Sequence, residues 1–324
     1  MIVILFTGGT ISMKHDAALG GAVPTLSGGE IVQATRGLAD VAAIEIDQWG
    51  SFPGPHMSID RMWALRNRIA VHLARRDVQG VVVTHGTDTL EESAYLVARS
   101  LPASRPVVFT GAMRTASDLG WDGPSNLLDA ARVAASPASA GKGVLISLGD
   151  RIHSALEVTK THTEARDAFD SPGLGALGEV DEGVVIYRRG MLDLPAPLMP
   201  DEPVQPVDIV YAYAGADGRL VDASCASGAK GLVIAAMGRG NVPPAMFEAI
   251  ARSVVSGMPV IITSRALLGR VGPTYGYPGG GRRLLEAGAI FAYGRRAGQA
   301  RIDLMLGLGC GYELEGIRGL FADR

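Results

Sequence analysis

The chain has 324 residues, a net charge of −3 and 47% apolar residues, so its length suggests two domains or one large one. It carries 30 basic against 33 acidic residues, which argues against a nucleic-acid partner, and its apolar content excludes a disordered chain. The apolar run nearest the N-terminus, Ile2–Phe6, is too short for a membrane span or a signal peptide, which predicts a cytoplasmic protein without membrane association. The alternative is a processed chain whose leader has been removed.

The first half of the chain alternates between short apolar runs and longer amphipathic ones. Four continuous apolar runs predict buried strands of a parallel sheet, at residues 2–6, 80–84, 107–110 and 144–148. Residues 58–75 repeat apolar side chains at nearly 3.6-residue spacing, which predicts a helix. Thr89 and Glu92 have the spacing of a capping box, which predicts a second helix beginning at Thr89. This alternation is typical of an α/β fold with right-handed crossovers.

Five prolines between Arg188 and Pro206 mark a break in composition. Such a stretch cannot be the interior of a helix, and we interpret it as a semi-extended linker. Beyond it, strands are predicted at 209–213, 232–236 and 260–263, and a helix at 243–256. We therefore predict an N-terminal α/β domain (1–187) with a mostly parallel sheet flanked by helices, a linker (188–206) and a smaller C-terminal α/β domain (207–324).

Two predicted strands end in loops that combine hydroxyl residues with glycine. The first loop reads TGGTIS over Thr7–Ser12, and the second reads THGTDT over Thr84–Thr89. Open parallel sheets bind ligands beyond the carboxyl ends of their strands, and a hydroxyl beside exposed backbone amides can act as a nucleophile. Taken alone, TGGT could equally be a tight turn or a phosphate cradle, and Asp88 could be a first-turn helix acid. Neither a GxGxxG nor a GxxxxGK[ST] pattern accompanies these loops.

Together, the two loops resemble the bacterial-type L-asparaginase family, which are homotetrameric threonine amidohydrolases. The similarity extends along most of the chain, and the ordered set with THGTDTLEE intact is highly specific. Further segments that match the family pattern are Gly111–Arg114 (GAMR), Asp122–Pro124 (DGP), Val158–Thr161 (VTKT) and Gly238–Asn241 (GRGN).

The resemblance implies a role for each matching residue. Thr10 would be the nucleophile, Thr87 and Lys160 would relay protons, and Asp88 would hold both this pair and the substrate's α-ammonium group. Main-chain amides at Thr10 and Thr87 would form the oxyanion hole. Asn241 would reach the active site of a neighbouring subunit, in a homo-oligomer that is a dimer or a dimer of dimers. The substrate-binding set implied in this way is Ser51, Gly54, Gly86, Asp88 and Asn241.

The proposed lysine can also be judged on its own chemistry. A threonine hydroxyl is a poor nucleophile without a base, and lysine is a base only where burial and neighbours lower its pKa. Lys160 lies in a nearly uncharged, threonine-rich stretch that suits this demand. The same stretch is also compatible with an ordinary surface lysine. His85, beside the second loop, is better suited to orienting that loop than to acting as a base.

The sequence departs from the family pattern in three places. Residues 12–28 contain no tyrosine, although the family often places one over the nucleophile. The loop can still close as a lid. Lys14 or His15 could substitute for the tyrosine, or the relay could suffice without it. Gly54 stands where some members have serine, which makes Ser51 the nearest hydroxyl for the α-carboxylate. Tyr275 lies where some members carry acidic residues. All three departures bear on specificity more than on the type of reaction.

The prediction is hydrolysis of L-asparagine to L-aspartate and ammonia through an acyl-threonine intermediate, without metal or cofactor. The six histidines show no metal-binding spacing, and the two cysteines are isolated. One alternative is a broader enzyme that also accepts L-glutamine, since one methylene is worth only about 1–3 kcal/mol in a pocket. Another is a two-domain amino-acid-binding protein with little activity. A third is the tRNA-linked amidotransferase subunit of the same fold, which normally carries an extra N-terminal domain.

Overall fold

The computed structural model describes residues 1–191 and 195–322. The chain divides into two compact units, Met1–Pro197 and Leu198–Arg324. Each unit contains its own sheet and its own hydrophobic core. The predicted linker (188–206) and C-terminal domain (207–324) include residues 192–194 and 323–324, which lie outside the described residues. The exact domain boundaries therefore stay a prediction.

An eight-stranded sheet forms the centre of the larger unit, in the order β12-β11-β8-β7-β6-β5-β1-β4. Its parallel part consists of β1 (Ile2–Gly8), β4 (Ile44–Phe52), β5 (Gly80–Thr84), β6 (Val107–Thr110) and β7 (Val144–Leu148). The antiparallel part consists of β8 (Arg151–Ser154), β11 (Gly178–Asp181) and β12 (Val184–Tyr187). The predicted mostly parallel sheet is confirmed, and four of its strands are the four continuous apolar runs.

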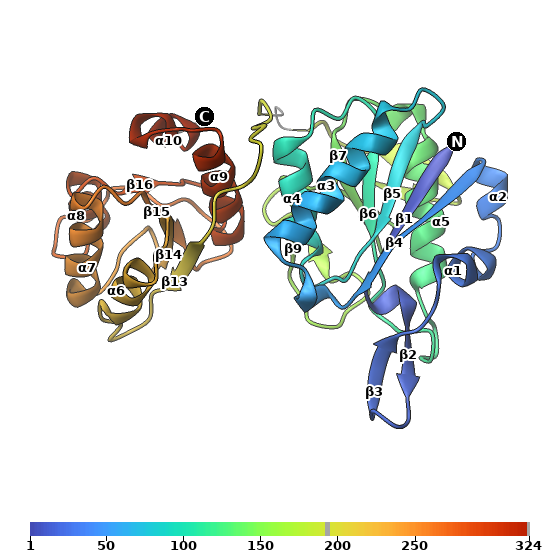
Figure 1. The fold of residues 1–324 in the computed structure, drawn as a ribbon, viewed down its shortest axis with the longest axis horizontal. Helices are drawn as coiled ribbons and strands as arrows, with labels where there is room; N and C mark the ends of the chain where they lie inside the picture. Colours follow the sequence, from blue (N-terminus) through green and yellow to red (C-terminus); the bar gives the residue numbers. More distant parts are fainter. Residues whose placement is uncertain (192–194, 323–324) are drawn as a thin grey trace. The chain divides into compact units, whose positions relative to one another are not determined.

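Helices cover both faces of this sheet, as Figure 1 shows. On one face lie α3 (Ile59–Ala74) and α4 (Leu90–Ser100), and on the other lie α1 (Gly28–Ala34), α2 (Leu38–Val41) and α5 (Gly123–Ala135). The core on the α5 face includes Val82, Val108 and Leu127, all fully buried. Because both faces are covered, the central strands β1, β5, β6 and β7 are buried at every position and almost continuously apolar, whereas the edge strand β4 carries Glu45 and Asp47.

The predicted capping box at the start of α4 is wrong, although the helix does begin directly after Thr89. Thr89 makes no side-chain cap, and its φ of −126° and ψ of 8° do not belong to the extended backbone usual at a cap. Its hydroxyl donates instead to the carbonyl of Gly54 at 2.7 Å. A long-range contact between two loops has replaced the local one that the spacing predicted.

The smaller unit has a four-stranded parallel sheet in the order β13-β14-β15-β16. Its strands are β13 (Val207–Tyr211), β14 (Gly231–Ala236), β15 (Val260–Ser264) and β16 (Ile290–Phe291). Its helices are α6 (Arg219–Ala226), α7 (Pro244–Val255), α8 (Gly281–Glu286), α9 (Ala297–Gly309) and α10 (Leu314–Leu320). The predicted strand at 209–213 is displaced by two residues, because pairing with β14 begins at Val207 and ends at Tyr211.

Among the described residues of the larger unit there are also three short 3-10 helices and two small hairpins outside the main sheet. The 3-10 helices are η1 (Thr10–Ser12), η2 (Gly54–His56) and η3 (Pro137–Ser139). One hairpin, β2 (Met13–Asp16) with β3 (Gly21–Pro24), projects from the body of the unit (Figure 1). The other pairs β9 (Thr159–Lys160) with β10 (Phe169–Asp170). Within residues 1–191 and 195–322, every helix is too short or too polar to cross a membrane.

Candidate functional site

Three loops come into direct backbone contact beyond the carboxyl ends of β1, β4 and β5. A methyl group added to Gly9 would lie 2.5 Å from the backbone nitrogen of Gly86, and one added to Gly86 would lie 2.5 Å from the Cα of Gly54. Carbon atoms in contact are separated by about 3.5–4.0 Å, so no side chain fits at either position. The predicted substrate-binding residues Gly54 and Gly86 are therefore brought together, beside the loop that carries Thr10.

Thr10 is the first residue of η1 and is half-buried. The preceding residue, Gly9, has a φ of 84°, a backbone conformation that favours glycine. The Ser12 hydroxyl closes the turn by donating to the carbonyl of Gly9 at 2.8 Å. Within the described residues, the Thr10 hydroxyl has no hydrogen-bond partner. Its oxygen is therefore not engaged by the fold itself.

Lys160 connects two residues of the loop after β5. Its Nζ donates to the Thr87 hydroxyl at 3.0 Å and lies 2.7 Å from Oδ1 of Asp88. The Lys160 side chain is 18% exposed and that of Asp88 is 58% exposed, while Thr87 is buried. The structure thus brings Lys160 to two other predicted catalytic residues, Thr87 and Asp88, which lie more than 70 positions before it in the sequence.

Glu91, in the first turn of α4, holds the strand that carries Lys160. Its carboxylate accepts a hydrogen bond from the Thr159 hydroxyl at 2.9 Å and another from the backbone N–H of Lys160. The sequence reasoning missed this contact. The only available signal was an additional acid in the TLEE run, which the helix dipole explains equally well.

His85 orients the loop after β5 through two hydrogen bonds of its buried ring. It is fully buried; its Nδ1 lies 2.9 Å from the carbonyl of Gly86 and its Nε2 lies 2.8 Å from the Ser93 hydroxyl. Burial lowers its pKa to about 4, against a smaller opposing effect of the hydrogen bond to Gly86. The imidazole is therefore neutral near pH 7, with Nδ1 as the donor and Nε2 as the acceptor. These contacts suit an orienting residue and not a base.

Two further predicted binding residues lie on other elements. Ser51 is an exposed residue near the end of β4. Asn241 belongs to the smaller unit, where its side-chain oxygen accepts from the backbone N–H of Gly281 at 3.2 Å. This hydrogen bond secures the start of α8 and engages only the oxygen of the amide. The roles predicted for Ser51 and Asn241 toward substrate stay predictions.

The residues at two of the three departures have contacts of their own. Lys14 and His15 are exposed on β2, and the backbone N–H of His15 donates to the Ser117 hydroxyl at 2.9 Å. Tyr275 stacks on Tyr277 with 5.5 Å between ring centroids. The carbonyl of Met13, at the start of β2, also accepts from the N–H of Ala116 at 2.9 Å, so the hairpin is attached along β2 to the loop before α5.

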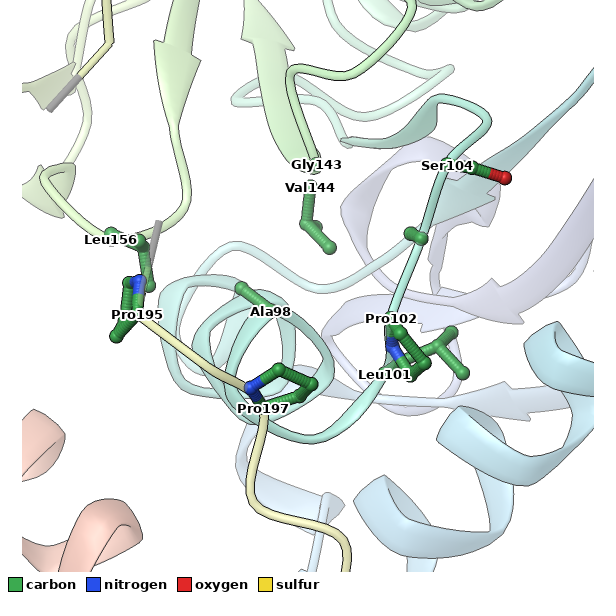
Figure 2. Close-up of a pocket in the computed structure, with 10 residues that line it drawn as sticks. Ala98, Leu101, Pro102, Ser104, Gly143, Val144, Leu156, Pro195 and Pro197 are labelled. Atoms are coloured by element: carbon green, nitrogen blue, oxygen red, sulfur yellow. The ribbon is translucent and has the colours of Figure 1, made fainter. Parts of the chain in front are cut away.

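Two cavities of similar size open in the larger unit. One, of about 290 Å³, is lined by Asp88, Lys160 and residues 161–163, next to the ionic cluster. The other, of about 300 Å³, lies near the amino ends of β6 and β7 (Figure 2). Its lining is aliphatic or proline-rich apart from Ser104 and contains no ionisable side chain. Acid–base chemistry is available only at the first of the two.

In the part of the chain that the structure describes, no cluster of three or more His, Cys, Asp or Glu residues could hold a metal ion.

Comparison with known proteins gives matches along both units. Residues 1–192 match the family model "Asparaginase, N-terminal", and residues 206–321 match "Glutaminase/Asparaginase C-terminal domain". The chain is 39% identical to "Probable L-asparaginase" of Deinococcus radiodurans, over 99% of this chain and 96% of that protein. It is 33% identical to "Probable L-asparaginase periplasmic" of Haemophilus influenzae, over 83% of this chain and 78% of that protein. The crystal structure of "Probable Cytoplasmic L-asparaginase from Campylobacter jejuni" superposes with a TM-score of 0.88 at 30% identity, covering 99% and 98% of the two chains.

Proposed function

The chain belongs to the asparaginase family, and from this premise we propose that it hydrolyses L-asparagine to L-aspartate and ammonia through an acyl-enzyme intermediate on Thr10. The observation that carries the proposal is the Lys160 ammonium group, which bridges Thr87 and Asp88. Thr87 and Asp88 belong to the loop after β5, in which Gly86 contacts Gly9, the residue before Thr10. This arrangement supports a hydroxyl nucleophile and a proton-relaying pair on adjoining loops.

In the first half of the reaction, the Thr10 oxygen attacks the side-chain amide carbon of the substrate. The Thr10 proton passes to the relay, and a proton is delivered to the amide nitrogen, which leaves as ammonia when the C–N bond breaks. In the second half, water attacks the resulting ester, its proton returns to Thr10, and L-aspartate is released. No net oxidation occurs and no co-reactant other than water is needed.

The negative charge that develops on the amide oxygen needs hydrogen-bond donors. Within the described residues, the backbone N–H groups of Thr10 and Thr87 have no acceptor in the fold. Both flank the glycine contact, so they are available to an oxyanion. Removal of one such donor typically slows an enzyme by about 10²–10³-fold.

The second oxygen of Asp88, on a largely exposed side chain, is available to the substrate's α-ammonium group.

The proposal is tested by ammonia release from L-Asn, L-Gln and D-Asn, using the wild type, Thr10→Ala and Thr10→Ser. We expect release from L-Asn, a loss in Thr10→Ala of about 10³-fold or more, and partial activity in Thr10→Ser because the hydroxyl is retained. If no amide releases ammonia, an amino-acid-binding protein is favoured instead. Undiminished release by Thr10→Ala would move the nucleophile to Thr87. The ratio of L-Asn to L-Gln rates measures the breadth of the substrate range.

Assembly and location are proposed on the same basis. We expect a homo-oligomer, a dimer or a dimer of dimers, in which Asn241 contributes to a neighbouring site. A size measurement that finds a stable and active monomer would remove this role. The cytoplasm is the proposed location; the relative from Campylobacter jejuni is named cytoplasmic, whereas that from Haemophilus influenzae is named periplasmic. Fractionation of cells expressing the natural gene decides between these compartments.

A further inference from the structure

We infer that Glu91 is a positioning residue for Lys160. It would fix the backbone of the lysine so that the ammonium group reaches Thr87 and Asp88. The inference rests on the proposed function, since it assigns Glu91 an effect on the reaction through Lys160. Glu91 does not itself touch the lysine ammonium in any contact of the structure; its partners are the Lys160 backbone and the Thr159 hydroxyl.

The strand that carries Lys160 has little support of its own. β9 is only two residues long and pairs with β10 alone, in a separate two-stranded sheet. An isolated two-stranded hairpin is marginally stable at best in water. The β10 side supplies the carbonyl of Ala168, which accepts from the N–H of Thr161 at 2.7 Å. The Lys160 N–H points away from β10. It donates to the Glu91 carboxylate, as it would to the carbonyl of a neighbouring strand on that side.

The position of Glu91 on α4 couples the two ends of the lysine. Asp88 and Glu91 lie three residues apart, at the junction of the β5 loop and the first turn of α4. This short segment therefore holds the backbone of Lys160 through Glu91 and its ammonium group through Asp88. A lysine side chain has four rotatable bonds, so a fixed backbone is needed to keep Nζ within 3.0 Å of Thr87. A displacement of about 1 Å at a reacting group can cost about 100-fold in rate.

Glutamine at position 91 separates the effect of geometry from that of charge. The glutamine oxygen can accept from the Lys160 N–H, and its NH₂ group can donate to the Thr159 hydroxyl, which can also accept. Alanine provides neither contact. We expect Glu91→Gln to retain kcat within about threefold of the wild type, and Glu91→Ala to lose about 10- to 100-fold in kcat with little change in KM. Thr159→Val, which removes only one of the two contacts, should show an intermediate loss.

A double-mutant cycle with Lys160→Ala tests whether Glu91 acts through the lysine. We expect Glu91→Ala to have no further effect on kcat once Lys160 is absent. Asp217→Ala is the matched control; Asp217 also accepts from a backbone N–H near the start of a helix, but in the smaller unit. It should leave kcat unchanged in both backgrounds. Thermal unfolding of each variant shows that the protein tested is folded.

Two results would overturn the inference while the proposed function stands. The first is a loss in Glu91→Ala that multiplies with that of Lys160→Ala, since this means that Glu91 acts independently of the lysine. The second is a Glu91→Gln variant as impaired as Glu91→Ala, because charge and not position would then matter; this comparison can be read even if Lys160→Ala is inactive. Loss of the proposed function itself has a different signature, namely a wild-type protein that releases no ammonia.

Discussion

Replacing Gly86 with alanine forces apart two loops that the proposed reaction needs in contact. The new methyl group would lie 2.5 Å from Cα and 2.6 Å from the nitrogen of Gly54. Because van der Waals contact requires about 3.5 Å, one loop must move by roughly 1 Å. Both obstructing atoms are backbone, and the Gly54 carbonyl is held by the Thr89 hydroxyl at 2.7 Å and by the Met57 N–H at 3.1 Å. No side chain can rotate away to relieve the clash.

Two magnitudes follow from this displacement. Overpacking of a close contact typically destabilises a protein by about 1–3 kcal/mol. Movement of the adjacent Thr87 by about 1 Å relative to Thr10 should lower kcat/KM by about 100-fold. Gly86 is not among the glycines with positive φ, so alanine is compatible with its backbone conformation and the effect reports space alone. A 100-fold loss corresponds to about 2.7 kcal/mol of transition-state stabilisation, comparable with the expected loss of stability, so activity should fall in protein that is still folded.

The assay combines ammonia release with urea unfolding of the same samples. Gly190→Ala is the matched control, because a methyl group there would meet no atom within 4 Å. It should match the wild type in both measurements. A Gly86→Ala protein with wild-type kcat/KM and wild-type stability would refute the reasoning, since the two loops could not then be in contact. Unfolding of both glycine variants to the same extent would refute it as well.

Three further predictions concern stability and are each tested by chemical denaturation. Ser58 caps α3 by accepting from the third backbone N–H of the helix, so Ser58→Ala should lose about 1 kcal/mol, and Ser58→Asp should restore most of it. Glu157 forms a largely buried ion pair with Arg189, so Glu157→Ala should lose about 2–3 kcal/mol by leaving the guanidinium unpaired; a change as small as that of an exposed pair would contradict this. Burial lowers the pKa of His85 and of His153 to about 4, below the unfolded value of about 6.5, so protonation favours the unfolded chain. Stability should be constant above pH 6.5 and fall between pH 6.5 and 4, by roughly 2 kcal/mol per histidine at pH 5, and His153→Gln should be less sensitive to acid than the wild type.

The central parallel strands could be predicted because burial on both faces requires a continuous run of apolar residues, which is visible in the sequence. The run at residues 80–84 is apolar up to its final threonine, and the structure places β5 there, with every residue buried. The hairpin of β2 and β3 gave no such signal, since its residues are small, polar or half-exposed. Its turn depends on Asp16, whose carboxylate accepts from the N–H groups of Ala18 and Leu19. This Asx-type turn is a local motif that could have been found in the sequence.

The site shows a similar division. Thr10 and Thr87 lie in loops at strand ends that combine glycine with hydroxyl residues. General chemistry alone predicts such residues as candidates for a site. Lys160 carries no comparable local signal, and only the family resemblance pointed to it. Glu91 escaped both approaches, because its partners lie 68 and 69 positions away and its place in a first helical turn already had an adequate explanation. Contacts that depend on tertiary structure leave little trace in the spacing of residues.

Glycine serves two opposite physical purposes in the loops around the proposed nucleophile. At Gly9 and Gly86 the missing side chain permits backbones to touch, and any Cβ would overlap atoms of a neighbouring loop. At Gly20 and Gly21, in the projecting hairpin, a Cβ would meet nothing within 4 Å. Gly20 is needed for its φ of 64°, whereas Gly21 has no steric reason to be glycine. The first pair holds the loop of the proposed nucleophile against the loop of the proposed relay, whereas at the second pair glycine is not required by close packing.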